Sequence, residues 1–284
     1  MPEGDTVWLA GRRMREALGG QLLTGSDFRV PQLATADLSG RRVLDVASRG
    51  KHLLTRVEGG QTLHTHFRMD GTWHLYRPGA RWRGGPAWQI RVVLTTIDWR
   101  AVGYRLPVVD LVPTAGEDTV VGHLGPDPLG TDWNLKDAVR RLASEPAREI
   151  GQALLDQRNL AGVGNLYKTE VCFLRGVSPW TAVADVPDLP ALVGLAARLL
   201  DANKGSWTQS TTGQTRQGQQ HWIFEREGQL CRRCGTRVAM AEQGTPPRQR
   251  LSYWCPYCQP GPAPTPLRRH QLPPPPRGTR RYKP

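Results

Sequence analysis

Hydrophobic and polar positions recur with two different periods along the chain, and these periods separate helical from β-rich parts. The first apolar stripe has helical spacing and predicts an amphipathic helix. Its members are Val7, Ala10, Met14 and Leu18. Asp5 or Thr6 would cap the start of this helix, and a glycine pair at 19–20 would end it. The pair Pro2-Glu3 is therefore expected to be exposed just outside the positive end of a helix dipole, which favours anions.

Residues 21–110 have the pattern of β structure. Short runs of β-branched, aromatic and leucine residues are separated by turn signals, and Gly59-Gly60 marks a hairpin. The expected strands are Val43–Val46, Lys51–Val57, Thr62–Phe67, Thr72–Tyr76 and Ile90–Ile97. Strands at this spacing predict a sandwich or a barrel. The tryptophans of this part are expected to be packing residues: Trp73, Trp82, Trp88 and Trp99.

The second half of the chain has helical periodicity. Val112–Gly130 is rich in Gly and Pro, lacks periodicity and is interpreted as a hinge between two domains. Four helices are expected after it, the second capped by Ser144: Leu135–Leu142, Pro146–Gln157, Gly164–Leu174 and Leu189–Asn203. From Pro260 onward the sequence is Pro/Arg-rich with almost no apolar content, which predicts disorder.

Composition and charge narrow the class of protein. A chain of 284 residues is long enough for two domains with ordinary cores. The net charge of +13 favours a polyanionic partner, with nucleic acid first. Removing the six Lys and Arg of residues 260–284 leaves +7, which is still basic. No apolar run has membrane length and the N-terminus has no secretory pattern, so a cytoplasmic protein without membrane contact is expected.

Four of the five cysteines form two Cys-x-x-Cys pairs, separated by 20 residues: Cys231, Cys234, Cys255 and Cys258. This spacing predicts one closed, structural Zn²⁺ site on a β-hairpin, in a reducing compartment. The basic residues around the hairpin fit phosphate binding and a solvated face equally well: Arg232, Arg233, Arg237, Arg248 and Arg250. The fifth cysteine, Cys172, is interpreted as a buried structural thiol.

A glycine-containing turn, 156–165, separates two of the helical patterns. Gly162 and Gly164 would let a backbone approach another surface closely. Asn165 would stand at the start of the next helix, where free N–H groups bind phosphate well. An ordinary helix–helix loop explains these residues as well.

Several motifs then occur in one order over residues 1–259. They are Met1-Pro2-Glu3-Gly4, Ser48-Arg49-Gly50-Lys51, His66-Phe67-Arg68-Met69, His123 to Leu129, Leu155 to Tyr167, and the cysteine segment that ends Arg250 to Gln259. With them the chain resembles the formamidopyrimidine-DNA glycosylase and endonuclease VIII family. The resemblance implies an α+β fold: an N-terminal β-sandwich flanked by helices, a hinge, and a C-terminal helical domain with a helix–two-turn–helix and a β-hairpin zinc finger. The implied divisions are 1–111, 112–130, 131–225, 226–259 and a tail at 260–284.

The resemblance also implies an activity, that of a bifunctional DNA glycosylase and abasic-site lyase of base excision repair. Removal of Met1 would expose the secondary amine of Pro2, which would form a Schiff base with sugar C1′. Glu3 would be the general acid and base. Lys51 would bind the phosphate beside the lesion and assist β-elimination, and Arg250 would support δ-elimination.

The implied DNA contacts are less uniform. Gly164 and Asn165 would hold the backbone of the damaged strand. Arg100 would keep a role beside the gap that the flipped base leaves in the helix. Met69 would fill the gap left by the flipped base, although a core methionine is the alternative. His64 and His66 share a strand face without an evident third metal ligand, so a polar sheet face is expected there.

Three departures from the family pattern favour the endonuclease VIII branch and oxidised pyrimidines. Thr6 replaces a second glutamate, Asp98–Gly103 lacks an aromatic wedge, and Gly205–Phe224 differs from the 8-oxoguanine type. The expected partner is double-stranded DNA with a damaged base or abasic site, bound by a monomer in the nucleoid. Two other readings stay open: a relative that grips damaged DNA without cutting, and a zinc-ribbon protein that contacts RNA or protein.

Overall fold

The protein is described by a computed structural model over residues 2–247 and 249–267. Helix α1 (Gly4–Leu18) opens the chain and buries the predicted apolar stripe in the core of the N-terminal lobe. Each large side chain of that stripe contributes about 1.5–3 kcal/mol on burial. The expected cap at Asp5 or Thr6 is wrong, since the helix begins at Gly4 with Glu3 at its N-cap. The Asp5 carboxylate is instead engaged by residues of other segments.

Two four-stranded sheets form the N-terminal lobe, and every strand pair in them is antiparallel. The first has the order β1 (Gly25–Phe28), β6 (Ile90–Thr95), β7 (Arg100–Tyr104), β5 (Thr72–Tyr76). The second has the order β2 (Val43–Arg49), β3 (His52–Val57), β4 (Gln61–His66), β8 (Val108–Pro113). Side chains of both sheets share one core, which confirms the predicted sandwich. Short 3₁₀ turns lie at Pro31–Leu33, Ala87–Gln89, Thr114–Gly116 and Val183–Asp185.

The sequence pattern located five of these eight strands and missed β1, β7 and β8. The Gly59-Gly60 hairpin is confirmed, because both glycines adopt positive φ between β3 and β4. Three of the four tryptophans pack as expected. Trp88 does not, since 74% of it is exposed.

The helical part follows residues 112–130, which the sequence predicted as a hinge and which contain the short helix α2 (Asp118–Val121). Its helices are α3 (Leu135–Ala143), α4 (Ile150–Leu155), α5 (Asn165–Leu174) and α6 (Leu189–Asn203). Helix α4 is shorter than expected, and Ser144 does not cap it. Ser144 is the C-cap of α3, and its hydroxyl donates to the carbonyl of Arg141 at 2.7 Å.

The cysteine segment folds as the predicted hairpin, β9 (Ala239–Gln243) paired with β10 (Arg250–Trp254). Met240 and Tyr253 pack into the same core as α5 and α6, so hairpin and helices are one packed unit. Residues 260–267, expected to be disordered, lie against this unit: Ser178 Oγ donates to the Pro262 carbonyl, and Leu267 N–H donates to the Met240 carbonyl at 2.7 Å. The rest of the predicted tail, 268–284, lies outside the described residues.

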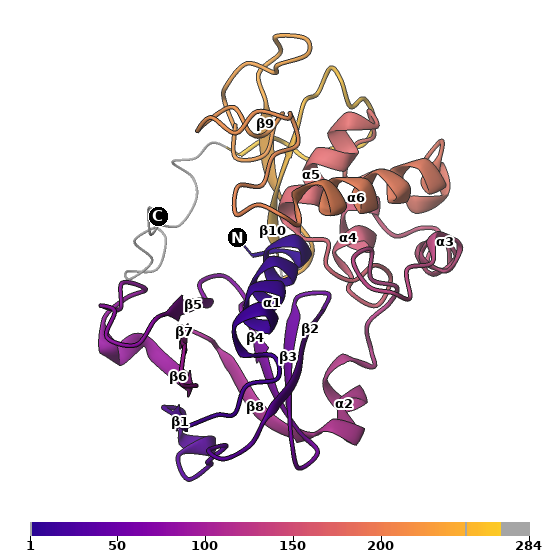
Figure 1. Ribbon diagram of the computed structural model, residues 1–284. Coiled ribbons are helices and arrows are strands. Elements are labelled where there is room, and N and C mark those ends of the chain that lie inside the picture. The colour runs from indigo at the N-terminus through magenta and orange to yellow at the C-terminus, as the bar shows by residue number, and fades with distance from the viewer. Residues whose placement is uncertain (1, 248, 268–284) are drawn as a thin grey trace.

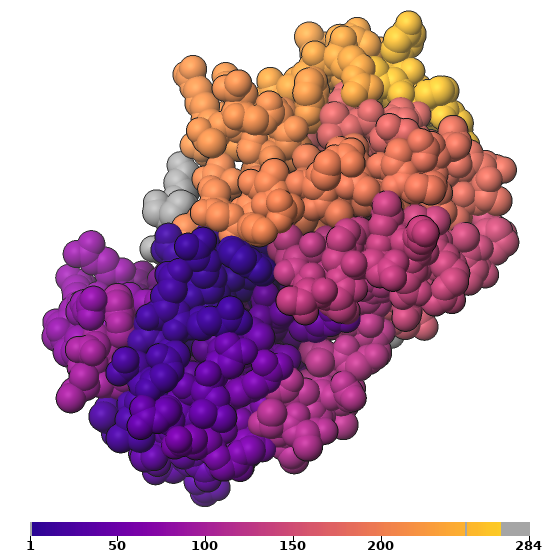
Figure 2. Space-filling view, turned by 45° about the vertical axis from the view of Figure 1, so that its right-hand side comes forward, coloured from indigo at the N-terminus to yellow at the C-terminus, as the bar shows by residue number. Residues whose placement is uncertain are grey.

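The two lobes meet at the N-terminal end of α1, which points toward the hairpin strand β10 (Figure 1). The space-filling view shows the indigo N-terminal residues directly beside the pink and orange C-terminal segments (Figure 2). In the described part of the chain, no helix has both the length and the apolar content needed to cross a membrane.

Candidate active site

The chain start meets the glycine turn at the junction of the two lobes. Pro2 is half-buried and Glu3 is fully buried, so the expectation of an exposed pair is wrong for Glu3. The two carboxylate oxygens of Glu3 accept the N–H groups of Gly164 at 2.7 Å and Leu166 at 2.8 Å. Glu3 therefore occupies the first amides of α5, which the sequence suggested would be free for phosphate.

The predicted close approach of backbones at this turn is confirmed. Gly4 N–H donates to the carbonyl of Gly162 at 2.9 Å, and Gly162 adopts φ +89°. A Cβ placed on Gly164 would lie 2.5 Å from the carboxyl carbon of Glu3. Only glycine fits at this position without moving the carboxylate.

The protonation of Glu3 is set mainly by its burial. Desolvation raises the pKa of the carboxyl above its usual value, and the nearby Asp5 raises it further. Lys51 and the two backbone N–H groups oppose this rise. A carboxyl whose pKa is raised can carry a proton closer to neutral pH, which suits a general acid.

Lys51 reaches the same junction from the turn between β2 and β3. Its Nζ donates to the carbonyl of Val163 at 2.7 Å, and the neighbouring Gly50 N–H donates to Asp127 at 2.7 Å. Burial lowers the pKa of Lys51, Glu3 opposes this, and Arg250 lowers it further. The three charged groups are therefore within electrostatic reach of one another.

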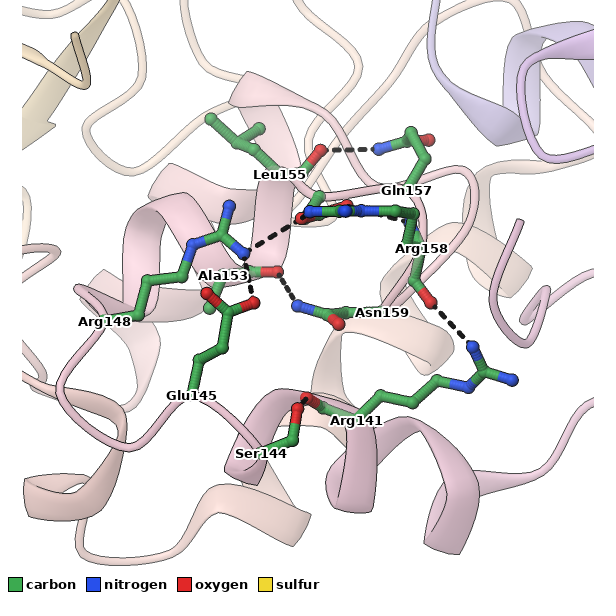
Figure 3. A network of polar contacts seen from close by, with 10 residues as sticks. Arg141, Ser144, Glu145, Arg148, Ala153, Leu155, Gln157, Arg158 and Asn159 are labelled. Atoms are coloured by element: carbon green, nitrogen blue, oxygen red, sulfur yellow. Dashed lines mark hydrogen bonds and ion pairs between the residues drawn. The ribbon is translucent and has the colours of Figure 1, made fainter. Parts of the chain in front are cut away.

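A network of ion pairs and side-chain hydrogen bonds holds the glycine turn (Figure 3). Asp156 accepts from Arg148 at 2.9 Å and from Arg158 at 2.7 Å, and these contacts hold the pKa of Asp156 well below its usual range. Gln157 donates to the Val163 carbonyl and accepts from Gly162 N–H. The turn is thus fixed before any partner binds.

Asn165 links α5 to the hairpin. Its Nδ2 donates to the carbonyl of Leu251 at 2.8 Å, while its Oδ1 is buried and has no partner among the described residues. Arg250, the residue before Leu251, is exposed and donates to the carbonyl of Gln249. Asn165 therefore fixes the strand from which Arg250 projects.

Met69 and Arg100 lie farther from this junction. Met69 is 58% exposed in the turn between β4 and β5, so the core-methionine alternative is wrong. Arg100 is half-buried at the start of β7 and donates to the carbonyls of Thr96 and Trp99. Its side chain is thus engaged by its own turn.

The four predicted metal ligands come together. Their sulfur atoms all lie within 4.8 Å of one another, with 3.4 Å between Cys234 and Cys255 and 4.0 Å between Cys231 and Cys258. Tetrahedral Zn–S bonds of about 2.3 Å place sulfurs roughly 3.8 Å apart. The thiol set therefore fits a tetrahedral metal ion. Cys172 is fully buried elsewhere, as predicted.

Three of the hairpin arginines have structural roles. Arg232, Arg233 and Arg237 donate to backbone carbonyls of the C-terminal lobe. Arg248 lies outside the described residues. Arg250 likewise donates to a backbone carbonyl, that of its neighbour Gln249, and its side chain is exposed.

The histidines form a larger cluster than the sequence indicated. His52 Nδ1 lies 2.8 Å from His64 Nε2, and His66 and His123 pack around the His52 ring. Burial lowers the pKa of His52 to about 3 and that of His66 to about 4. Over the described ranges, the cysteine cluster is the one group close enough to hold a metal ion. The lowered pKa values of His52 and His66 favour the neutral form of these two rings near pH 7.

Sequence reasoning missed a second carboxylate at the junction. Asp5 is fully buried, and it accepts hydrogen bonds from Tyr167 Oη at 2.6 Å and from Gln209 Nε2 at 2.8 Å. Burial raises the pKa of Asp5. Its place in the first helical turn resembles an ordinary capping position, so no local signal distinguished it.

Lys168 is a further residue that the sequence did not single out. It is fully buried on α5, where its Nζ donates to Ser252 Oγ of β10, and Ser252 in turn donates to Gln243. Burial lowers the pKa of Lys168 to about 8. The amine is thus a buried link between α5 and the hairpin.

We expect Lys168 to make stability depend on pH. The unfolded lysine binds its proton up to a pH near 10.4 and the folded one up to about 8, so the free energy of unfolding should rise with pH between these values. Urea unfolding at pH 8 and pH 10 should show that Lys168→Met loses about 1–3 kcal/mol of this rise. Lys136→Met, at an exposed position, should keep it. Equal pH slopes for the wild type and Lys168→Met would contradict the prediction.

Comparison with known proteins gives one consistent family. The formamidopyrimidine-DNA glycosylase N-terminal domain matches residues 1–106, and the formamidopyrimidine-DNA glycosylase H2TH domain matches residues 124–190. The probable endonuclease 8 2 of Streptomyces coelicolor is 58% identical over 94% of this chain and 96% of its own length. The DNA-(apurinic or apyrimidinic site) lyase Nei2 of Mycolicibacterium smegmatis is 43% identical over 91% of this chain and 99% of its own length.

Solved structures agree on the fold. A complex between the Lactococcus lactis Fpg and DNA containing an abasic site matches with a TM-score of 0.75. The match covers 91% of this chain and 100% of the other at 21% sequence identity. This likeness concerns the arrangement of the elements.

Proposed function

The chain belongs to the formamidopyrimidine-DNA glycosylase and endonuclease VIII family, and on this premise we propose that it acts through a covalent intermediate on the Pro2 nitrogen. It is a DNA glycosylase with abasic-site lyase activity in base excision repair. The observation that carries the proposal is the buried Glu3 carboxyl, which lies next to Pro2 in the chain and near Lys51 in space.

The chemistry starts from the secondary amine that removal of Met1 exposes. Its lone pair forms a bond to sugar C1′ while the bond between C1′ and the damaged base breaks. The amine loses its proton, the sugar ring opens, and an iminium cation joins nitrogen and C1′. This cation draws electrons from the C2′–H bond, so that C2′ loses its proton and the 3′ phosphate leaves in β-elimination. Loss of a second proton, from C4′ of the conjugated iminium, then expels the 5′ phosphate in δ-elimination. Glu3 moves the protons at the base and the ring oxygen.

The remaining assignments concern the DNA backbone and the gap. Lys51 holds the phosphate beside the lesion, and Arg250 holds a flanking phosphate during δ-elimination. Asn165, at the start of α5, positions the damaged strand, while Gly164 acts through Glu3, whose carboxylate takes up its N–H. Met69 fills the gap in the helix, since it is exposed on a turn, and Arg100 borders it.

The substrate that we assign is double-stranded DNA with an oxidised pyrimidine or an abasic site. The assignment to oxidised pyrimidines is supported by the departures from the family pattern: Asp98–Gly103 lacks an aromatic wedge, Thr6 replaces a second glutamate, and Gly205–Phe224 differs from the 8-oxoguanine type. We assign the catalytic part to residues 1–111, the hinge to 112–130, the helix–two-turn–helix to 131–225 and the zinc finger to 226–259. We assign its action to a monomer in the cytoplasm, at the nucleoid.

A borohydride trap tests the covalent step. The protein is incubated with a labelled duplex that contains one dihydrouracil, reduced with borohydride, and digested for peptide mass spectrometry. An adduct on the Pro2 peptide is expected. An adduct formed only with an abasic duplex would support the lyase activity and reject the assignment of pyrimidine lesions as substrate. No adduct with either duplex would reject the covalent mechanism.

We assign one structural Zn²⁺ to the four cysteines, since their sulfur geometry fits a closed tetrahedral site. The ion would hold the ends of the hairpin that carries Arg250. It needs no part in the reaction, because four protein ligands leave no open position.

Removing the metal is expected to weaken DNA binding. A chelator-treated protein should lose the order of the hairpin and about tenfold or more in affinity for an abasic duplex, because Arg250 and its strand are no longer held. Cys255→Ala should behave in the same way, while Cys172→Ala, outside the cluster, should keep one zinc per chain. Elemental analysis and fluorescence anisotropy measure both effects. Unchanged affinity after complete zinc loss would contradict the assignment.

A further inference from the structure

One contact between the two lobes has no part in the mechanism above. The carboxylate of Asp5, in the first turn of α1, accepts hydrogen bonds from Gln209 Nε2 at 2.8 Å and 3.1 Å, one to each oxygen. Tyr167 Oη on α5 donates to the same carboxylate at 2.6 Å. Because Glu3 is two residues before Asp5, this contact brings Gln209 to the catalytic end of the junction.

The segment that carries Gln209 is anchored next to it. Ser210 N–H donates to Asn203 Oδ1 at 2.7 Å, and Asn203 Nδ2 donates back to the Ser210 carbonyl at 2.9 Å. The Thr211 hydroxyl donates to Glu170. The backbone at Gln209 is therefore fixed from α6 and α5, independently of Asp5.

Glu170 also fixes the other end of the segment. Its fully buried carboxylate accepts the consecutive N–H groups of Trp222 at 2.8 Å, Ile223 at 2.9 Å and Phe224 at 2.8 Å. A segment held at both ends presents its side chains in fixed positions. The hydrogen bonds from Gln209 Nε2 to Asp5 then set the orientation of one of these side chains, the Gln209 amide.

A carboxylate accepts hydrogen bonds and cannot donate them, so it holds the amide by its NH₂ end. The carbonyl oxygen Oε1 is left as a hydrogen-bond acceptor. Across the described residues, no group donates to it, and it is not among the buried polar atoms that lack a partner. Oε1 is thus accessible to a bound molecule.

We infer that Gln209 is a specificity-determining residue that reads an imide N–H of the damaged base, and that Asp5 is the positioning residue that sets its orientation. The inference rests on the proposed function, in which the base leaves the helix and lies beside Pro2 and Glu3. The matching substrate class is the damaged pyrimidines that keep an N3–H between two carbonyl groups, and ring-saturated dihydrouracil is one example. A base methylated at N3 offers no donor to Gln209.

Two isolated reactions separate this role from a structural one. A preformed abasic duplex has no base to read, so its cleavage reports the lyase without Gln209. Asp5→Asn and Gln209→Leu should each slow single-turnover removal of dihydrouracil by about 10–100-fold, the loss expected for one hydrogen bond to a buried group. Both should cleave the abasic duplex within about twofold of the wild type.

The double variant and a methylated substrate complete the test. Because both substitutions act on one contact, Asp5→Asn with Gln209→Leu should be no slower than Gln209→Leu alone. The wild type should prefer dihydrouracil over its N3-methyl form, and both variants should lose most of this preference. Gln214→Leu, an exposed glutamine of the same segment, is the matched control and should behave as the wild type. Thermal unfolding verifies that each variant is folded.

The outcomes are distinct. The inference is supported if the single variants lose base removal but keep abasic-site cleavage, and if the double variant is no slower than Gln209→Leu. Equal loss of both reactions, additive effects, or unchanged removal by Gln209→Leu would overturn it. A wild type that forms no borohydride adduct with the abasic duplex would instead reject the proposed covalent mechanism.

Discussion

Protein with one residue added ahead of Pro2 is expected to lose base removal and strand cleavage by about 10³-fold or more. The extension converts the secondary amine into a tertiary amide, whose nitrogen has no lone pair available for C1′. The Glu3 carboxyl and Lys51 would remain in place, since their contacts are made to residues 163–166. Single-turnover gel assays on dihydrouracil and abasic duplexes measure both reactions.

A second variant distinguishes lost chemistry from crowding. Pro2→Gly leaves a primary amine, which still adds to C1′, so it should keep a borohydride adduct at a reduced rate. The extended protein should still bind an abasic duplex, because phosphate contacts are made elsewhere. Strand cleavage that survives the extension, with an adduct on a lysine peptide, would assign the nucleophile to that lysine.

The sequence predicted those parts of the fold where one local period dominates. Helix α1 was located because its buried side repeats every three to four residues, and β3 and β4 because a glycine pair separates two β-rich runs. Strand β7 was missed because the short apolar run after Trp99 is not bounded by a turn signal at each end. The error at α4 has a similar cause, since Ser144 suits either end of a helix.

The sequence predicted the members of the candidate site better than the contacts between them. The cysteine spacing and the motif order predicted four metal ligands and the site members Pro2, Glu3 and Lys51. The structure brings the four cysteine sulfurs within 4.8 Å of one another, a spacing that can hold a metal ion. Burial of Glu3 could not be predicted, because it depends on the amides of Gly164 and Leu166, about 160 residues away. The same is true of Asp5, whose partner Gln209 lies in a segment without periodicity. Contacts between distant segments leave no mark in local patterns.

The largest effect after that of Pro2 is expected for Glu3→Gln. The glutamine is isosteric and stays neutral, so it can accept one backbone N–H but cannot give a proton to the base or the ring oxygen. Base removal should fall by about 10²–10⁴-fold. Cleavage of a preformed abasic duplex should fall by much less, because the base has already left. Glu16→Gln, on the exposed side of the same helix, should change neither reaction.

The pH dependence of base removal gives an independent measure of the same role. Burial raises the pKa of Glu3, so the carboxyl keeps its proton above the pH at which an exposed glutamate ionises. If this proton is given to the departing base, the single-turnover rate of the wild type falls as pH rises through the raised pKa. In Glu3→Gln this fall in rate with rising pH should be absent, because the amide does not titrate. If the rate of Glu3→Gln still falls as pH rises, the titrating group would be a residue other than Glu3. Parallel loss of both reactions would mean that the carboxylate acts by holding Gly164 and Leu166 in place.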